Sequence, residues 1–160
     1  MKSKKAQAWG FDMIVGTGIF ILGITAFFLY TVNYPTGEQE KLDDLIYEGN
    51  IIGSNLLSEG FPADWTVSTV SKIGLLSDKI INQSKLEEFN TLASSEYGRT
   101  KAIFGIKYNY FINFSEPIQI SGSNIEGIGL TSENKNNNIK VSRVSIYQNK
   151  PITIDIQIWD

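Results

Sequence analysis

The sequence predicts an α+β protein: one long apolar helix at the N-terminus, then a domain of helices followed by antiparallel strands. Three observations support this. Residues 13–32 are mainly apolar and contain no charge. Residues 42–56 repeat apolar side chains at helical spacing. From residue 106 onward the chain contains stretches that alternate with the period of two typical of strands.

The apolar run is long enough to cross a lipid bilayer. Residues 13–32 number 20, and at ~1.5 Å per residue they span about 30 Å. A secretory signal peptide has an apolar region of about 7–15 residues and a small-x-small cleavage site behind it. Here the chain continues with Asn33-Tyr34-Pro35 instead. We therefore predict a transmembrane helix over residues 7–34 that stays on the mature protein, rather than a buried core helix.

The charges on the two sides of this run predict its orientation. Lysines precede it at positions 2, 4 and 5, whereas acids dominate the residues just behind it. The positive-inside rule then places the N-terminus in the cytoplasm and the domain 36–160 outside the cell membrane. The expected protein is single-pass, with an extracytoplasmic α+β domain.

The residues just before the apolar run contain a short motif. Lys4 and Lys5 form a basic pair, Ala6 is small, and Gln7 follows. This order resembles the class III signal peptide of archaeal type IV pilin-like proteins, in which a basic pair is followed by Gly or Ala and commonly by Gln. The resemblance implies that a prepilin-type signal peptidase recognises Lys4 and Lys5 and cuts between Ala6 and Gln7. Residues 1–6 would then be a leader.

The sequence departs from the pilin pattern at two points. Many pilins have Glu at the fifth mature position, but that position is Phe11 here, and Asp12 follows one residue later. Pilins also tend to continue the anchor helix into the head, whereas Pro35-Thr36-Gly37 should break or kink it. By the resemblance, Asp12 would pair with an amine of a neighbouring subunit during assembly. The alternative is a hydrated carboxylate in the headgroup layer.

Small residues mark one face of the predicted transmembrane helix. Gly16 and Gly23 are seven residues apart and therefore lie on one side. Small residues let helices approach closely in lipid, although glycine is frequent in membrane helices generally. This face is a candidate for self-association with other pilin-like subunits.

The first half of the outer domain is predicted to contain three helices and one extended stretch. Residues 38–59 have an apolar stripe with acids opposite, and Gly60-Phe61-Pro62 ends the helix. An extended stretch is expected over residues 64–73, with Trp65 in the core. Ser84 and Glu87 have the spacing of a capping box, which predicts a short helix from Ser84. Another short helix is expected over residues 96–104, stopped by Gly105.

The second half is predicted to form strands. Residues 106–114 alternate, and residues 139–147 and 152–159 indicate a hairpin around the turn 148–151. Four isoleucines of the last strand share one face, which a helix or second sheet must cover: they are Ile152, Ile154, Ile156 and Ile158. The stretch GSNIEGIGL indicates a turn-rich connector, and the Asn-rich residues 133–138 indicate a solvated loop.

The composition leaves little room for catalysis. The chain has no histidine and no cysteine, which excludes Ser-His-Asp and Cys-His arrangements. From residue 36 onward it has 16 acidic and 11 basic residues, a net charge of −5 (17 − 1 acids, 14 − 3 bases), which disfavours nucleic acid as a partner. We expect no enzyme, no cofactor and no catalytic residue.

A hard-cation site is an alternative to a solvated acidic face at four residues: Glu38, Asp43, Asp44 and Glu48.

Two sequons offer candidate glycan acceptors outside the cell, Asn82-Gln83-Ser84 and Asn113-Phe114-Ser115. Asn113 falls in a predicted strand, so Asn82 in its turn is the better candidate.

The segment from Phe61 to Phe89, together with the later YNYFINF, is also similar to the heads of membrane-anchored archaeal proteins with this kind of leader. The sequence thus predicts a pilin-like structural subunit or accessory component of a cell-surface filament. The alternative is a monomeric anchored binding module without a filament role.

Overall fold

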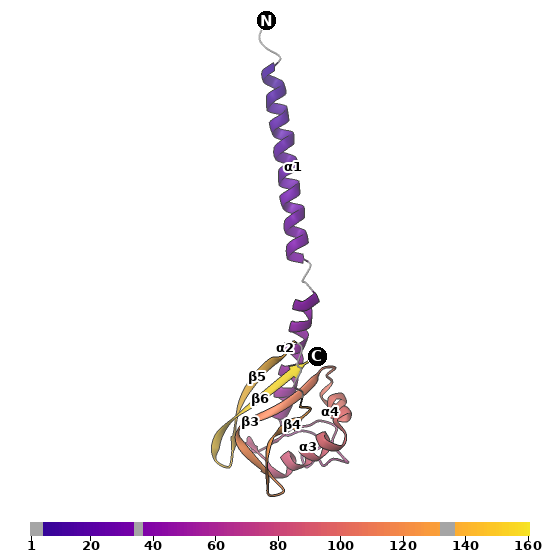
Figure 1. Ribbon diagram of the computed structural model, residues 1–160, viewed down its shortest axis with the longest axis vertical. Coiled ribbons are helices and arrows are strands. Elements are labelled where there is room, and N and C mark those ends of the chain that lie inside the picture. Colours follow the sequence, from indigo (N-terminus) through magenta and orange to yellow (C-terminus); the bar gives the residue numbers. More distant parts are fainter. Residues whose placement is uncertain (1–4, 34–36, 132–136) are drawn as a thin grey trace. The chain divides into compact units, whose positions relative to one another are not determined.

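The computed structural model describes residues 5–33, 37–131 and 137–160. The chain forms two compact units, Met1–Glu40 and Lys41–Asp160. The predicted α+β class is confirmed, since a long apolar helix is followed by further helices and then by antiparallel strands (Figure 1). Residues 1–4 of the predicted leader, residues 35–36 of the expected break and most of the Asn-rich loop lie outside the described residues.

The first two helices are separate elements. Helix α1 (Lys5–Asn33) contains the whole predicted apolar run. Helix α2 (Gly37–Leu56) matches the helix predicted from apolar spacing. The buried apolar residues of α2 are Leu45, Ile52 and Leu56. Leu42 and Ile46, also in the predicted stripe, remain 44% and 42% exposed. The helix therefore packs in the head mainly through its part from Leu45 onward.

Four strands form one antiparallel sheet (Figure 1). The strands are β3 (Asn109–Ile120), β4 (Ser123–Gly129), β5 (Ile139–Tyr147) and β6 (Lys150–Trp159), in the order β4-β3-β6-β5. The four isoleucines of β6 are all buried, as predicted. Helix α2 covers this face: a Cβ added at Gly53 would lie 3.2 Å from Ile156 Cδ1. Of the two covers expected for the isoleucine face, a helix or a second sheet, the structure has the helix.

The predicted hairpin between β5 and β6 is confirmed, but its turn is shorter than the expected residues 148–151, because Lys150 and Pro151 already belong to β6. Tyr147 pairs with Lys150 across a two-residue turn. Gln148 and Asn149 in this turn have φ angles of 47° and 64°. Two successive positive φ values are the signature of the type I′ turn, whose twist suits a two-residue hairpin.

The prediction of a connector at GSNIEGIGL was wrong, because most of this stretch is strand β4 and pairs with β3. Its glycines serve close packing. A Cβ on Gly127 would collide with the carbonyl oxygen of Ile112 and lie 2.5 Å from Phe111 Cζ. The pairing is irregular, since Asn113 pairs with Gly127 and Ile118 with Ile125, which leaves residues 114–117 opposite Glu126 alone. Glycine in this strand indicates close approach and a nearby bulge rather than a turn.

The predicted extended stretch over residues 64–73 was also wrong. Turns replace it, with the Val70 N–H donating to Thr66 O at 3.0 Å. Trp65 is buried, as expected for a core residue, and its indole N–H donates to Gly74 O at 2.9 Å. The apolar spacing in this stretch reflects packing of a compact loop into the core. A small hairpin follows, β1 (Leu76–Ser77) with β2 (Ile80–Ile81).

The two short helices are present, with one change of cap. Helix α3 (Gln83–Ser95) begins one residue before Ser84, and its cap is Asn82, whose Oδ1 accepts the Lys85 N–H at 3.2 Å. The prediction of a capping box at Ser84 and Glu87 was therefore wrong. Asn82, which is itself a strong capping residue, caps the helix instead. Helix α4 (Tyr97–Phe104) ends at Gly105 with φ 72°, as predicted.

Aromatic side chains connect α3 and α4 to the sheet. Phe89 and Phe104 meet edge to face at 6.0 Å, and Phe104 meets Tyr110 of β3 in the same way at 5.6 Å. The Tyr110 hydroxyl lies 2.5 Å from Thr100 Oγ1. Burial raises the pKa of Tyr110, so this phenol stays neutral and is a packed residue of the core.

Candidate functional site

Within the described residues, one helix is long and apolar enough to cross a membrane. It is the segment Gly10–Val32 of α1, which has 23 residues and a mean hydropathy of 2.1. Its side chains are exposed along the whole segment. Membrane anchors and signal sequences near an N-terminus both have this length and composition. An apolar surface of this extent needs lipid or other helices to cover it.

The predicted assembly residues lie on this helix. Asp12 is exposed, and Cβ atoms added at Gly16 or Gly23 would meet no described atom within 4 Å. Of the predicted leader motif, Lys4 lies outside the described residues. Lys5, Ala6 and Gln7 open α1, whose bounds begin at Lys5. Recognition of the lysines and cleavage between Ala6 and Gln7 stay predictions.

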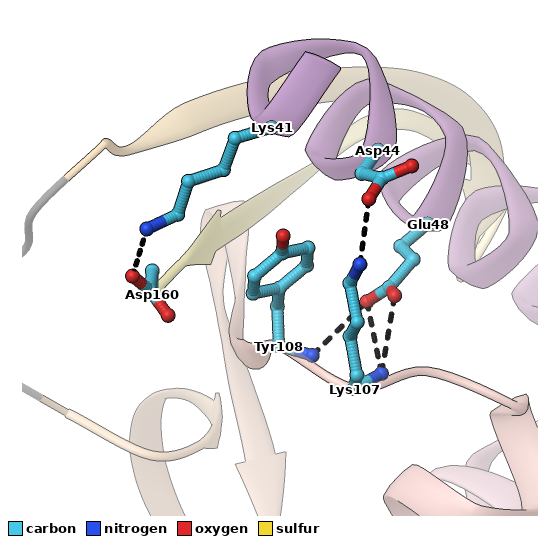
Figure 2. Close-up of polar contacts among 6 residues, drawn as sticks. All are labelled: Lys41, Asp44, Glu48, Lys107, Tyr108 and Asp160. Carbon is cyan, nitrogen blue, oxygen red and sulfur yellow. Dashed lines mark hydrogen bonds and ion pairs between the residues drawn. The ribbon is translucent and has the colours of Figure 1, made fainter. Parts of the chain in front are cut away.

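A charged cluster fastens α2 to the segment that leads into β3 (Figure 2). Glu48 on α2 is buried, and both of its carboxylate oxygens lie 3.1 Å from the Lys107 backbone N. The same carboxylate accepts the Tyr108 N–H at 3.1 Å. One helical turn earlier, Asp44 accepts from Lys107 Nζ at 2.6 Å. The helix thus binds the start of the sheet through backbone and side-chain donors together.

Lys107 is the cation of this cluster. Its hydrogen bond to Asp44, followed by its interaction with Tyr108, raises the pKa of Lys107 to about 12. The Lys107 ammonium also lies 4.7 Å from the centroid of the Tyr108 ring, in reach of a cation–π contact. The side chain stays charged at physiological pH, so it remains the cationic partner of the Asp44 carboxylate.

A further ion pair connects α2 with the end of β6. Lys41 pairs with Asp160, the residue behind β6 (Figure 2). Their side chains are 32% and 47% exposed, so solvent screens the attraction and its energy is small. This pair helps to orient α2 relative to the end of β6 but contributes little to stability.

The acidic set proposed for a hard cation is not brought together. Glu48 is used by two backbone N–H groups, and Asp44 is paired with Lys107. In the described part of the chain, no group of three or more Asp, Glu, His or Cys residues is placed to hold a metal ion. Asp43 is exposed, and the side chain of Glu38 lies outside the description.

A second candidate site is a cavity of about 320 Å³ beside the start of α3. Residues that line it include Trp65, Asn82, Lys85 and Glu88. Lys85 is only 6% exposed, and its ammonium donates to the carbonyl oxygens of Glu59 and Leu76 at 2.8 and 2.7 Å.

One turn along α3, Glu88 accepts the Val67 N–H at 2.7 Å. Lys85 and Glu88 therefore hold the loop between α2 and α3 against α3. The cavity walls contain hydrogen-bonding groups of both kinds, from hydroxyl and ammonium donors to carboxylate acceptors.

Glu48 was predicted to lie on a solvated or cation-binding acidic face and Lys85 was not singled out, although the sequence contains a signal for the buried position of both. Glu48 follows Leu45 by three residues and precedes Ile52 by four, so it lies on the apolar stripe of its helix. Lys85 precedes Phe89 by four residues in the same way. A charged residue at an apolar position of an amphipathic helix is a sign of a buried, partnered charge.

The two sequons occupy different surroundings. Asn82 caps α3, is half-buried, and donates through Nδ2 to Ser77 Oγ at 3.2 Å. Asn113 lies in β3, as predicted, at the irregular pairing with β4.

Comparison with known proteins adds no relative: no family model, no curated protein and no solved structure matches this chain. The function is therefore inferred from the chain's own residues. The features that bear on it are the exposed apolar helix, the junction at Glu48 and the cavity at Lys85.

Proposed function

We propose that this protein is a pilin-like structural subunit, or an accessory component, of a cell-surface filament, anchored by its N-terminal transmembrane helix. The observation that carries the proposal is the exposed apolar segment Gly10–Val32. Lipid covers such a helix before assembly, and the helices of neighbouring subunits cover it in a filament. Gly16 and Gly23 leave room on one side for close approach of another helix.

The head supports a mechanical role. Helix α2 follows α1 after only three residues, and it is held in the head by buried apolar side chains and by the carboxylate of Glu48. A load that arrives along α2 is therefore shared between core packing and several hydrogen bonds. Such fastening suits a domain displayed at the end of an anchor.

The leader motif supplies the assembly chemistry. Cleavage between Ala6 and Gln7 by a prepilin-type signal peptidase would create a free ammonium at Gln7, five residues before Asp12. In the filament, Asp12 pairs with such an amine of an adjacent subunit and fixes the register between subunits. A carboxylate at the start of an apolar span costs free energy unless it has a partner or reaches water, which gives the pair its driving force.

N-terminal sequencing of the membrane form tests the leader. The expected first residue is Gln7, and a mature protein that still begins at Met1 or Lys2 would contradict the pilin-like function. A protease added to intact cells tests the orientation, since it should digest residues 36–160. Full protection of that domain would place it in the cytoplasm.

The variant Asp12→Asn tests assembly. It should be cleaved and inserted like the wild type but lose incorporation into filaments or detergent-stable oligomers. Asp43→Asn is the matched control, because Asp43 is an exposed acid of the head, and it should assemble normally. Wild-type assembly of Asp12→Asn would leave Asp12 as a hydrated headgroup residue and the glycine face as the remaining assembly feature.

The second candidate function is a monomeric, membrane-anchored extracytoplasmic binding module. The cavity beside Lys85 and Glu88 favours it, because it offers donors and acceptors to a small polar ligand. Cross-linking in native membranes separates the two functions. A ladder of multimers supports the filament subunit, whereas monomers at all cross-linker concentrations support the binding module. Neither function requires an enzyme, a cofactor or nucleic acid.

A further inference from the structure

The structure separates the two sequons by how their amides are used. Asn82 employs both ends of its amide, since Oδ1 accepts the Lys85 N–H that caps α3 and Nδ2 donates to Ser77. Like Asn113 it is half-buried, and it lines the cavity beside Lys85. A sugar attached to Nδ2 of Asn82 would disrupt the hydrogen bond to Ser77, and it would have to extend to the solvent through that cavity. Gln83 and Ser84, the rest of this sequon, already lie in the first turn of α3.

Asn113 is placed differently. Its neighbours Ile112 and Phe114 are buried, so alternation along β3 puts Asn113 on the opposite face of the sheet. Its partner on β4 is Gly127, which has no side chain. On β6 its partner is Asp155, whose carboxylate is engaged by Lys140 and Ser142. Among the described residues no hydrogen bond involves the Asn113 side chain.

The space next to Asn113 is open. A cavity of about 600 Å³ is lined by Asn113 and Ser115 of the sequon and by residues of the irregular pairing, including Glu116, Pro117 and Glu126. Residues 115–117 are exposed. Asn113 itself is paired with both neighbouring strands, and the Ser115 hydroxyl accepts the Thr153 N–H at 3.0 Å. The irregular, exposed segment begins directly behind Asn113, so an enzyme reaches this sequon at the end of a regular pairing and without unwinding a helix.

We propose that Asn113, and not Asn82, is the N-glycosylation site of this protein. Nδ2 of Asn113 attacks the anomeric carbon of a lipid-phosphate-linked oligosaccharide. The new C–N bond replaces the C–O bond to phosphate, the lipid phosphate leaves with the electron pair, and one amide proton passes to a base of the transferase. The proposal rests on the extracytoplasmic placement of the head given under the proposed function.

The glycan would cover a weak place in the fold. Strand β4 is an edge strand, and residues 114–117 interrupt its pairing with β3. Exposed edges of this kind recruit strands of other chains. A sugar that projects from Asn113 over the cavity at this irregularity hinders such contacts.

The test is glycopeptide mass spectrometry of the full chain, purified from membranes of a host that N-glycosylates a reporter with an Asn-X-Ser sequon. Three variants accompany the wild type: Asn113→Gln, Asn82→Gln and Ser121→Asn. The last creates a sequon with Ser123 at an exposed turn whose residue 121 has φ 50°, a value that asparagine tolerates well. It reports whether the head reaches the glycosylating compartment at all.

The expected result is one glycan on the wild type, lost completely in Asn113→Gln, kept in Asn82→Gln and joined by a second glycan in Ser121→Asn. A glycan on Asn82, or modification of residue 121 without modification of Asn113, would overturn the assignment while leaving the orientation intact. Absence of any glycan from all four proteins would overturn the assignment together with the extracytoplasmic placement.

Discussion

Replacing Glu48 by alanine should destabilise the head by about 2–3 kcal/mol. The carboxylate accepts the backbone N–H groups of Lys107 and Tyr108, and alanine leaves both donors without this partner. A buried backbone donor that loses its partner costs about 1–3 kcal/mol. These contacts are part-buried, so water compensates in part. Two donors at about 1–1.5 kcal/mol each give the expected loss.

Urea unfolding of the full chain in detergent, followed by near-ultraviolet circular dichroism, measures this loss. The buried Trp65 and Trp159 report on head packing. Glu48→Gln should cost about half as much as Glu48→Ala, because the amide keeps one acceptor. Lys107→Ala removes the ion pair with Asp44 but keeps the backbone N–H, so it should change the free energy of unfolding by about 0.5 kcal/mol or less.

The ranking of these variants is the decisive result. If Lys107→Ala were as damaging as Glu48→Ala, the exposed ion pair rather than the backbone contact would hold the junction. If Glu48→Ala unfolded at the same urea concentration as Asp43→Ala, an exposed substitution on the same helix, the junction would contribute nothing to stability and its assigned mechanical role would fail.

Three further substitutions test other parts of the head. Gly98→Ala should stabilise it by about 0.5 kcal/mol, because a Cβ there meets no described atom within 4 Å and alanine favours α4. Gly74→Ala should cost about 3 kcal/mol or prevent folding, because its Cβ would collide with backbone atoms of Gly60 and Ser58; urea midpoints measure both. For Asp155, partial burial would raise the pKa, but hydrogen bonds from Lys140 and Ser142 hold it below its ordinary value. A lowered folded-state pKa gives stability that is present above the unfolded pKa of about 4 and is lost as pH falls through the folded value. Asp155→Asn should therefore cost about 0.5 kcal/mol at pH 7 and nothing at pH 2, and an equal cost at both pH values would exclude ionisation as the cause.

Periodicity predicted the parts of the fold in which one face of an element meets the core. The alternation of isoleucines in β6 and the stripe of α2 both identified buried faces, and Gly105 ended its helix as expected. These features depend on local spacing and on the conformational freedom of one residue type. Local sequence contains that information.

The failures share another physical origin. Glycine in β4 was interpreted as turn chemistry, but Gly127 is needed because the carbonyl of Ile112 and the ring of Phe111 come close to it from the next strand. Glu48 was assigned to a solvated face, but its partners are backbone groups about sixty residues further along the chain. Contacts between distant segments decide both cases, and spacing along one element does not contain them.

The buried core lies in the head, so substitutions in the apolar helix and in the head should have separable effects. Within the described residues, all buried apolar side chains lie between Leu45 and Trp159, and none belongs to α1. The head therefore has a core made of its own side chains. A substitution on α1 such as Asp12→Asn should leave the urea midpoint of the head unchanged, while Glu48→Ala should shift that midpoint without affecting the proposed cleavage between Ala6 and Gln7. Loss of assembly in the first variant can then be attributed to α1 itself, since the folded head serves as its own internal control.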